Sequence, residues 1–255
     1  MPRCVFISGA SSGIGAALAR RYAREGATLG LAARGGEALR SFAAQLGTTA
    51  VPYPADVADT AAIGAAAADF VARHGAPDIV IASAGISVGT SGADPDDLPV
   101  LERVLRTNVI GLAATLAPFV APMRDRGRGA LVGIASIAGF RGLPGAGAYS
   151  ASKAAAIAWL ESLRVELHGT GVSVVTICPG YIDTPMTRAN PYPMPFLLAA
   201  DEGARRIARA IDGGGSQVVI PWQMALVGYV LRRLPNRLYD AFGARAPRKP
   251  RQPPR

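Results

Sequence analysis

The chain has 255 residues, half of them apolar, which is long enough to bury a large core as one α/β domain. Cys4 and Cys178 both lie in apolar, strand-like runs, a pattern that favours free thiols in a reducing compartment over a disulfide. No apolar run reaches the roughly eighteen residues of a membrane span, and no signal peptide is visible. We therefore expect a cytoplasmic protein.

The net charge of +9 is unevenly distributed along the chain. Residues 232–255 carry eight basic side chains against one acidic residue, Asp240, so this segment holds +7 and the rest of the chain only +2. A nearly neutral main domain is not typical of a nucleic-acid-binding face. We expect no nucleic-acid partner, and no cluster of metal ligands stands out in the sequence.

Apolar runs rich in β-branched residues alternate with longer alanine-rich helical patterns. This alternation predicts a doubly wound, Rossmann-type α/β fold, a mostly parallel seven-stranded sheet with helices on both faces. The predicted strands cover residues 3–8, 27–33, 49–53, 77–83, 129–135, 172–178 and 216–220. The predicted helices cover residues 13–25, 36–46, 59–73, 99–117, 149–168 and 199–211. Residues 1–221 form the predicted nucleotide-binding catalytic domain, and residues 222–255 an appended amphipathic helix with a basic tail.

A glycine-rich loop follows the first predicted strand, with the order Gly9-Ala10-Ser11-Ser12-Gly13-Ile14-Gly15. Glycines at such a place let the backbone turn tightly and approach a pyrophosphate, whose charge is met by the amides at the start of the next helix. The spacing differs from the common G-x-G-x-x-G, but its position between a strand and a helix supports a dinucleotide site.

The ends of the next two strands bear on which nucleotide is bound. The second strand ends at Arg34 without an acidic residue, and an arginine there accommodates the 2′-phosphate of NADP(H). We expect NADP(H) rather than NAD(H), with an ordinary loop arginine as the alternative. Asp56, before Val57 at the end of the third strand, is predicted to bind the adenine amino group, or alternatively to cap a helix.

Tyr149 and Lys153 stand four positions apart at the start of a predicted helix, so their side chains share one face. An adjacent ammonium stabilises a phenolate and lowers the pKa of the tyrosine. Ser136, thirteen residues before Tyr149, is predicted to supply a hydroxyl to the same place. Only two of the 27 basic residues are lysines, which favours a specific need for lysine at 153 over a solvated surface pair.

Taken together, these motifs resemble those of the classical short-chain dehydrogenase/reductase family. The resemblance extends from residue 3 to about residue 220. It rests on these residues: Gly9, Gly13, Gly15, Asn108, Ser136, Tyr149, Lys153, Pro179 and Gly180.

The resemblance implies a catalytic role for four residues. Tyr149 would exchange a proton with the substrate oxygen, and Lys153 would bind the nicotinamide ribose and lower the pKa of Tyr149. Ser136 would hydrogen-bond the substrate oxygen as charge develops on it. Asn108 would hold a water that links Lys153 to solvent. The nicotinamide cofactor would supply the hydride.

The resemblance also implies a set of cofactor contacts. They are Gly9, Ser11, Ser12, Gly13, Ile14, Gly15, Arg34, Asp56, Val57, Ala84, Gly85, Tyr149, Lys153, Pro179, Gly180, Ile182 and Thr184. Two positions depart from the family pattern: Ser8 replaces a threonine, and Ala82-Ser83-Ala84-Gly85 replaces Asn-Asn-Ala-Gly. The second departure removes side-chain hydrogen bonds at a strand end, for which Ser83 is a candidate replacement.

Substrate specificity is predicted to come from loops at the carboxyl ends of the strands. Phe140, Leu143 and Tyr181, beside Ser136 and Tyr149, and a proline-rich lid over residues 188–198 imply a hydrophobic carbonyl or secondary alcohol as substrate. Two alternatives stay open: a non-catalytic nucleotide-binding regulator, and a lipid-ketone reductase similar to 3-ketodihydrosphingosine reductase at a membrane surface.

The C-terminal extension has two interpretations. Trp222 and Tyr229, followed by clustered arginines, suit contact with an anionic membrane surface, which would place the protein peripherally on the inner face of the membrane. Alternatively, a helix packs on the body and a basic tail is disordered. By resemblance the protein is a homo-oligomer, a dimer or tetramer, with helices 99–117 and 149–168 at the dimer faces.

Overall fold

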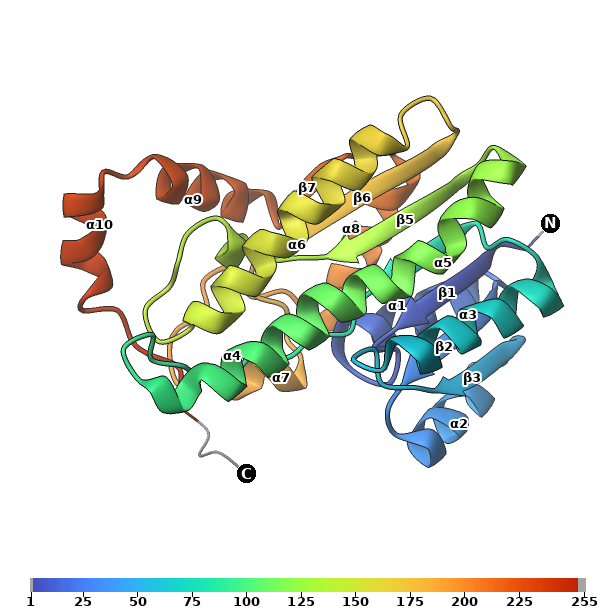
Figure 1. Cartoon of the computed structure of the whole chain (residues 1–255), viewed down its shortest axis with the longest axis horizontal. Helices are drawn as coiled ribbons and strands as arrows, with labels where there is room; N and C mark the ends of the chain where they lie inside the picture. Colours follow the sequence, from blue (N-terminus) through green and yellow to red (C-terminus); the bar gives the residue numbers. More distant parts are fainter. Residues whose placement is uncertain (1, 252–255) are drawn as a thin grey trace.

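The computed structural model describes residues 2–251. Seven parallel strands form one sheet in the order β3-β2-β1-β4-β5-β6-β7 (Figure 1). The strands are β1 (Cys4–Ser8), β2 (Thr28–Ala33), β3 (Ala50–Pro54), β4 (Ile79–Ala82), β5 (Gly129–Ile134), β6 (Val172–Pro179) and β7 (Gln217–Ile220). All seven predicted strands are present, and the predicted doubly wound parallel fold is confirmed.

Helices cover both faces of the sheet. The α-helices are α1 (Gly13–Arg24), α2 (Gly36–Ala44), α3 (Thr60–His74), α4 (Leu98–Leu105), α5 (Gly111–Arg126), α6 (Gly147–Glu166), α7 (Pro185–Arg188), α8 (Ala200–Asp212), α9 (Trp222–Arg233) and α10 (Asn236–Gly243). Short 3-10 turns lie at Pro95–Asp97 and Ile137–Gly139.

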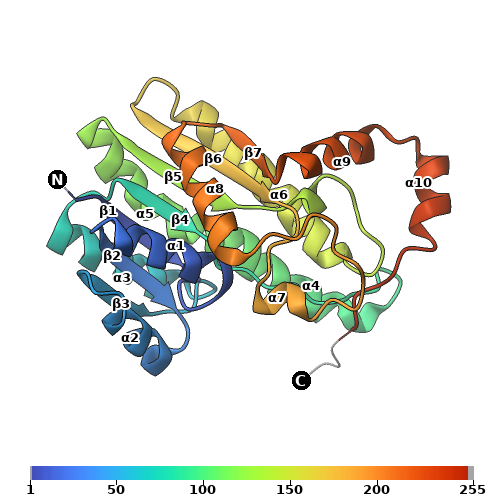
Figure 2. The same cartoon turned by 180° about the vertical axis from the view of Figure 1, so that it is seen from behind.

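Two apolar cores lie on opposite faces of the sheet. Helices α1, α2 and α8 pack over one face, seen in Figure 2, and α3, α5 and α6 over the other, seen in Figure 1. Alternate side chains of one strand enter different cores: Val5 and Ile7 join the first, and Phe6 the second. This explains why the strands are apolar throughout, because neither face meets water.

The strand order reverses beside β1, which pairs with β2 on one side and β4 on the other. In an open α/β sheet, such a reversal leaves a crevice outside the carboxyl ends of the strands, where ligands bind. The fold therefore places the loops after β1, β4, β5 and β6 around one crevice.

The helix predicted to end at residue 117 is longer than expected. A helical stretch runs from Pro95 to Arg126, through Pro118 and Pro122, with a π-helical turn at Arg106–Ile110. Leu116, Phe119 and Met123 are fully buried, so packing on the sheet outweighs the hydrogen bonds that the prolines remove. The stretch is long and apolar enough to cross a membrane by length and composition, but α5 packs against α3, β4 and β5 as a core helix.

The C-terminal extension differs from the interpretation with one packed helix and a disordered tail. It forms two helices, which separate at Leu234-Pro235, and a following segment that returns to the body (Figures 1 and 2). Arg255, the last of the basic residues, lies outside the described residues. Cys4 and Cys178 are free thiols, as predicted.

Candidate active site

The glycine loop joins β1 to α1 by close backbone contacts. Gly9 has a φ of +68°, and a Cβ there would lie 2.6 Å from the amide nitrogen of Ala84, after β4. A Cβ on Gly15 would lie only 2.3 Å from the carbonyl oxygen of Gly9. The loop therefore requires glycine at both positions, and these contacts hold the start of α1 close to the ends of β1 and β4.

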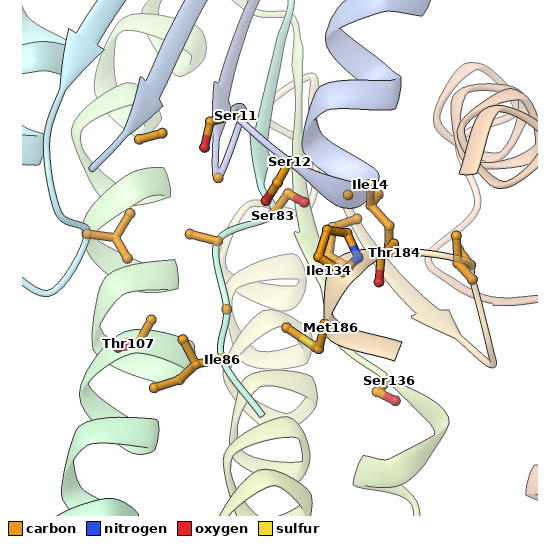
Figure 3. A pocket seen from close by; sticks show the side chains of 18 of the residues that line it. Ser11, Ser12, Ile14, Ser83, Ile86, Thr107, Ile134, Ser136, Thr184 and Met186 are labelled. Atoms are coloured by element: carbon orange, nitrogen blue, oxygen red, sulfur yellow. The ribbon is translucent and has the colours of Figure 1, made fainter. Parts of the chain in front are cut away.

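This loop forms one wall of a cleft of about 370 Å³ (Figure 3). Most of the predicted cofactor and catalytic residues line the cleft together: Gly9, Ser11, Ser12, Gly13, Ile14, Arg34, Asp56, Val57, Ala84, Gly85, Ser136, Tyr149, Lys153, Pro179, Gly180, Ile182 and Thr184. The cleft follows the carboxyl ends of the strands, as expected from the reversal beside β1. It is elongated enough to connect the two predicted ends of a dinucleotide site, Arg34 and Tyr149.

Some predicted residues lie outside this lining: Gly15, Asn108, Phe140, Leu143 and Tyr181. Others line the cleft without having been assigned to it: Ala33, Gly35, Ala55, Ser83, Ile86, Thr107, Ile134, Ala135, Pro185, Met186 and Thr187. Six of these eleven lie at the end of a strand or within two residues after it, a positional signal that the sequence contains: Ala33, Gly35, Ala55, Ser83, Ile134 and Ala135. Met186 and Thr187 belong to the short helix α7, which the sequence pattern did not predict.

Tyr149 and Lys153 lie on one face of α6, as their spacing predicts. The Lys153 Nζ atom lies 5.7 Å from the centre of the Tyr149 ring and donates a hydrogen bond to the carbonyl of Ile134 (2.7 Å). Lys153 is almost fully buried, and this burial lowers its pKa to about 8. Its ammonium therefore stands at the end of β5, held by one backbone acceptor, while Tyr149 opens into the cleft.

The pKa of Tyr149 is governed mainly by the burial of its phenol. Burial raises it above the ordinary value for tyrosine, and a hydrogen bond with the Ser136 hydroxyl opposes the rise without cancelling it. The Lys153 ammonium is directed to the carbonyl of Ile134 and desolvation of the phenol dominates, so the predicted effect of Lys153 on this pKa stays a prediction. Tyr149 is therefore protonated at neutral pH.

Ser136 directly follows β5 and caps the 3-10 turn at Ile137–Gly139. Its Oγ accepts from the amide of Ala138 (3.1 Å) and lies 3.4 Å from the carbonyl oxygen of Pro179, to which it donates. These contacts fix the hydroxyl between the ends of β5 and β6. The hydroxyl lies close enough to the phenol of Tyr149 to oppose the rise in its pKa, and both residues line the cleft.

Asn108 is fully buried in the π-helical turn at Arg106–Ile110. Its Oδ1 accepts from the amide of Ile86 (2.8 Å), and its Nδ2 donates to the carbonyl of Ile86 (2.9 Å) and to Ser152 Oγ (2.9 Å). A Cβ at Gly85 would lie 3.3 Å from Asn108 Oδ1 and 3.6 Å from Lys153 Nζ. Asn108 therefore ties the end of β4 to α6 beside Lys153, and its predicted role with a water stays a prediction.

The opposite end of the cleft is lined by Arg34 and Asp56. Arg34 is exposed after β2. The Asp56 Oδ1 atom accepts a hydrogen bond from the amide of Ala58 (2.9 Å), while the cap of α3 is Asp59. The alternative interpretation of Asp56 as a helix cap is therefore wrong.

Thr184 lies opposite the glycine loop. A Cβ on Gly13 would approach the methyl group of Thr184 to 3.3 Å, so the loop and the start of α7 face each other across the cleft. The Thr184 hydroxyl accepts from the amide of Thr187 (3.4 Å) in a capping box. This bond orients the Thr184 side chain beside the cleft.

The predicted substrate residues are placed differently from one another. Phe140 packs against α9, because Gly228 leaves room for its ring and Arg232 lies over it at 3.9 Å. The expectation that Phe140 faces the substrate is therefore wrong. Tyr181 is half-buried beside the lid, where its backbone carbonyl accepts from the amide of Leu198 (3.0 Å).

A tyrosine of the lid adds a group that the sequence did not single out. The pKa of Tyr149 is raised slightly by the Tyr192 phenol, and that of Tyr192 by the Tyr181 phenol. Tyr192 therefore lies within electrostatic range of Tyr149, and Tyr181 within range of Tyr192. Within residues 2–251, no group of three or more His, Cys, Asp or Glu side chains is arranged to hold a metal ion.

The site and the fold agree with comparisons to known proteins. The family model described as "short chain dehydrogenase" matches residues 3–193. An uncharacterized oxidoreductase of Myxococcus xanthus is 40% identical over 95% of this chain and 97% of its own length. The NAD(+)-dependent 2-dehydro-3-deoxy-L-rhamnonate dehydrogenase of a Sphingomonas strain is 38% identical over 72% of this chain and 74% of its own.

A solved structure has the same architecture over nearly all of both chains. The short chain dehydrogenase of Burkholderia cenocepacia, crystallised in complex with NADP, is 25% identical and has a TM-score of 0.83. Its alignment covers 96% of this chain and 98% of that one. The chain therefore belongs to the short-chain dehydrogenase family and is an oxidoreductase.

Proposed function

We propose that this protein interconverts a hydrophobic carbonyl compound and its secondary alcohol, with NADP(H) as the cofactor and Tyr149 as the proton-transfer group. One observation carries the proposal: Tyr149, Lys153 and Ser136 open into the same cleft as the glycine loop. A proton donor and a nucleotide-binding loop thus share a single cavity, the arrangement that hydride transfer to a carbonyl needs.

The glycine loop fits a dinucleotide by its own geometry. Gly9 and Gly15 stand where any Cβ would collide with backbone atoms, and Ser12, Gly13 and Ile14 at the start of α1 line the cleft. Amides at such a helix start favour an anionic group. When bound, the nicotinamide would supply or accept the hydride. On the protein side, Lys153 and the turn after β6 would orient it.

Proton transfer would be carried by the chain's own groups. The raised pKa of Tyr149 keeps the phenol protonated at neutral pH, so it is ready to donate to a carbonyl oxygen. The Ser136 hydroxyl, fixed between the ends of β5 and β6, would hydrogen-bond the same oxygen. This protonation state favours the direction of carbonyl reduction.

NADP(H) rather than NAD(H) is supported by Arg34. Its guanidinium is exposed at the rim of the cleft, at the position directly after β2 where an acidic residue would hold a ribose hydroxyl. The NADP complex of the Burkholderia protein agrees with this choice, and the NAD(+) dependence of the Sphingomonas relative is the contrary case. A hydrophobic substrate is supported by the lid, where Phe196 and Leu197 are exposed and where Tyr192 lies close enough to the Tyr149 phenol to raise its pKa.

The experiment that tests this function replaces Tyr149 by phenylalanine. We expect Tyr149→Phe to lower the rate of NADPH-dependent reduction of long-chain or aromatic ketones at least about a hundredfold. This is the rate factor that a positioned general acid typically contributes. NADPH affinity, measured by fluorescence titration, should stay within about twofold of the wild type. Normal turnover by the variant would overturn the proton-donor role. Failure of both proteins to bind NADPH would overturn the cofactor assignment.

We also propose that the protein forms a homodimer through α4 and α6. These helices pack side by side, and each exposes large apolar side chains: Leu98 and Ile110 on the α4 side, Val165 on α6. An exposed apolar face of this kind on a water-soluble domain is typical of a subunit interface.

A further inference from the structure

Helices α9 and α10 expose an unusual number of apolar side chains. Of the eleven large apolar side chains that are most exposed among residues 2–251, six lie on these two short helices. We call them the C-terminal apolar surface: Trp222, Leu226, Tyr229, Val230, Leu238 and Phe242. Trp222 and Phe242 are 70% and 69% exposed, so the body of the protein covers only a small part of each side chain.

The spacing of these residues places them on one side of each helix. In α9, Trp222, Leu226 and Tyr229 follow one another by four and three positions, which is one helical face. The opposite face, with Met224 and Gly228, is buried against the body. In α10, Leu238 and Phe242 are likewise four apart and exposed.

Arginines stand at the end of each apolar face. Arg233 continues the face of α9 and stacks on Tyr229, with its guanidinium carbon 3.9 Å from the ring centre. Arg245, exposed in the turn after α10, comes three positions after Phe242, and the exposed Arg237 directly precedes Leu238. None of these three arginines has an ion-pair partner in the described part of the chain.

The helices are held rigidly while this surface stays outward. Arg141, from the loop after β5, donates to the carbonyls of Leu231 (2.9 Å) and Leu234 (2.5 Å) and to Asn236 Oδ1 (2.7 Å). It also lies over the ring of Tyr239 at 4.1 Å. Arg141 thus connects the end of α9, the turn at Leu234-Pro235 and α10. The arrangement of the two helices is therefore fixed before any partner binds.

We propose that the C-terminal apolar surface rests on an anionic lipid membrane. Apolar side chains beside unpaired arginines suit a partner with an apolar interior and a negatively charged face, which a bilayer with anionic headgroups provides. A second copy of this chain fits less well, because pairing the same surface about a two-fold axis would bring the arginines of both copies together. At 12 and 8 residues, α9 and α10 are too short to cross a bilayer, so they lie in its interface.

This proposal goes beyond the reductase function and is tested apart from it, by sedimentation with vesicles. The full-length protein should sediment with vesicles of phosphatidylcholine and phosphatidylglycerol in equal parts, and much less with phosphatidylcholine alone. The variant Trp222→Ser/Phe242→Ser should lose most of this binding. The variant Arg237→Glu/Arg245→Glu should lower the partition coefficient about thirtyfold or more. Each basic residue near an anionic surface contributes a factor of about five, so the loss of two gives about thirtyfold before charge reversal is added.

A matched control reverses two arginines elsewhere. Arg24→Glu/Arg40→Glu makes the same change of net charge on exposed positions of α1 and α2, at the end of the molecule away from α9 (Figures 1 and 2). We expect it to bind vesicles nearly as well as the wild type. NADPH titration of every variant checks that the nucleotide site is intact.

A fluorescence readout reports the contact directly. The chain has two tryptophans, Trp159 in α6 and Trp222, so in a Trp159→Phe background the emission comes from Trp222 alone. This emission should shift to the blue with anionic vesicles. Equal sedimentation of the wild type and both surface variants, or no blue shift, would overturn the proposal. Self-association that disappears in Trp222→Ser/Phe242→Ser, without vesicle binding, would assign the surface to a second copy instead.

Discussion

Lys153 is an ammonium buried at the end of β5, and the protein stabilises it with one backbone acceptor, the carbonyl of Ile134. Its pKa of about 8 shows that desolvation outweighs this bond. Helix α6 packs on the end of β5 at this point, and an apolar side chain there would cost less free energy to bury than the ammonium does. The residue is therefore kept at an expense to stability, as is common for groups that serve a site.

Replacing Lys153 by methionine should therefore stabilise the fold while removing activity. Because the pKa is lower in the folded state, the stability cost is complete below pH 8. It disappears as the pH rises toward the ordinary value of 10.5, where the unfolded chain also loses the proton. Lys153→Met should raise the free energy of unfolding at pH 7 by at most about 3 kcal/mol. Denaturant unfolding at pH 7 and pH 10 measures this.

The pH dependence of the difference in unfolding free energy tests whether desolvation of Lys153 is its cause. The difference between the variant and the wild type should shrink between pH 8 and pH 10. A loss of stability at pH 7 would mean that the bond to Ile134 outweighs the desolvation of Lys153. Lys249→Met, at the only other lysine, controls for the loss of one positive charge.

Arg34 carries the second prediction at this scale. Arg34→Ala removes the guanidinium at the rim of the cleft, so the Kd for NADPH should rise by about tenfold, the worth of one exposed charge-assisted hydrogen bond. The Kd for NADH should stay nearly unchanged, because NADH has no 2′-phosphate. Fluorescence titration with both nucleotides tests this, and equal weakening of the two would argue against recognition of the phosphate.

At the scale of elements, the segment 244–251 behaves as a strap. Lys249 Nζ donates to Ser87 Oγ (3.0 Å), and Arg251 pairs with Asp94 (2.6 Å) and with Asp97 (3.0 Å). A Cβ at Gly89 would collide with the carbonyl oxygens of residues 249 and 250, so the two backbones touch. The strap therefore connects the end of α10 to the loop after β4, which leads from the active site into α4.

Cutting the ion pairs of Arg251 should loosen the strap. Arg251→Ala removes the contacts with Asp94 and Asp97, each worth about 1 kcal/mol or less. Trypsin should then cleave after Arg245 and Arg248 about fivefold faster under native conditions, as read by mass spectrometry. Arg237→Ala, in α10, is the control and should leave the rate unchanged. An unchanged rate in Arg251→Ala would show that backbone packing alone holds the strap.

At the scale of the whole molecule, the long helical stretch and α6 expose Leu98, Ile110 and Val165 on the proposed dimer face. Ile110→Glu would place a carboxylate in the proposed dimer face without touching the core, since Ile110 is half exposed. We expect the wild type to sediment as a dimer in analytical ultracentrifugation and Ile110→Glu to shift toward the monomer. Val165→Thr, a milder change on α6, should retain the dimer. A monomeric wild type would contradict the proposed interface.

The sequence by itself determined the sheet, its flanking helices and most of the cleft. Apolar runs of strand length and the glycine loop act locally, and the order of parallel strands brings their carboxyl ends to one edge. Residues that follow a strand end, such as Ser136 and Arg34, therefore reached the cleft as predicted. The spacing of Tyr149 and Lys153 likewise fixed their common helix face.

Only the tertiary structure decided the features that depend on what surrounds a side chain. The raised pKa of Tyr149 and the direction of the Lys153 ammonium follow from burial and from the carbonyl of Ile134, neither of which is local in sequence. Phe140 packs against α9, about 90 residues further along the chain. Arg251 pairs with Asp94 and Asp97, about 150 residues earlier in the chain. Such partners are chosen by packing and desolvation across the whole fold, and no local pattern encodes them.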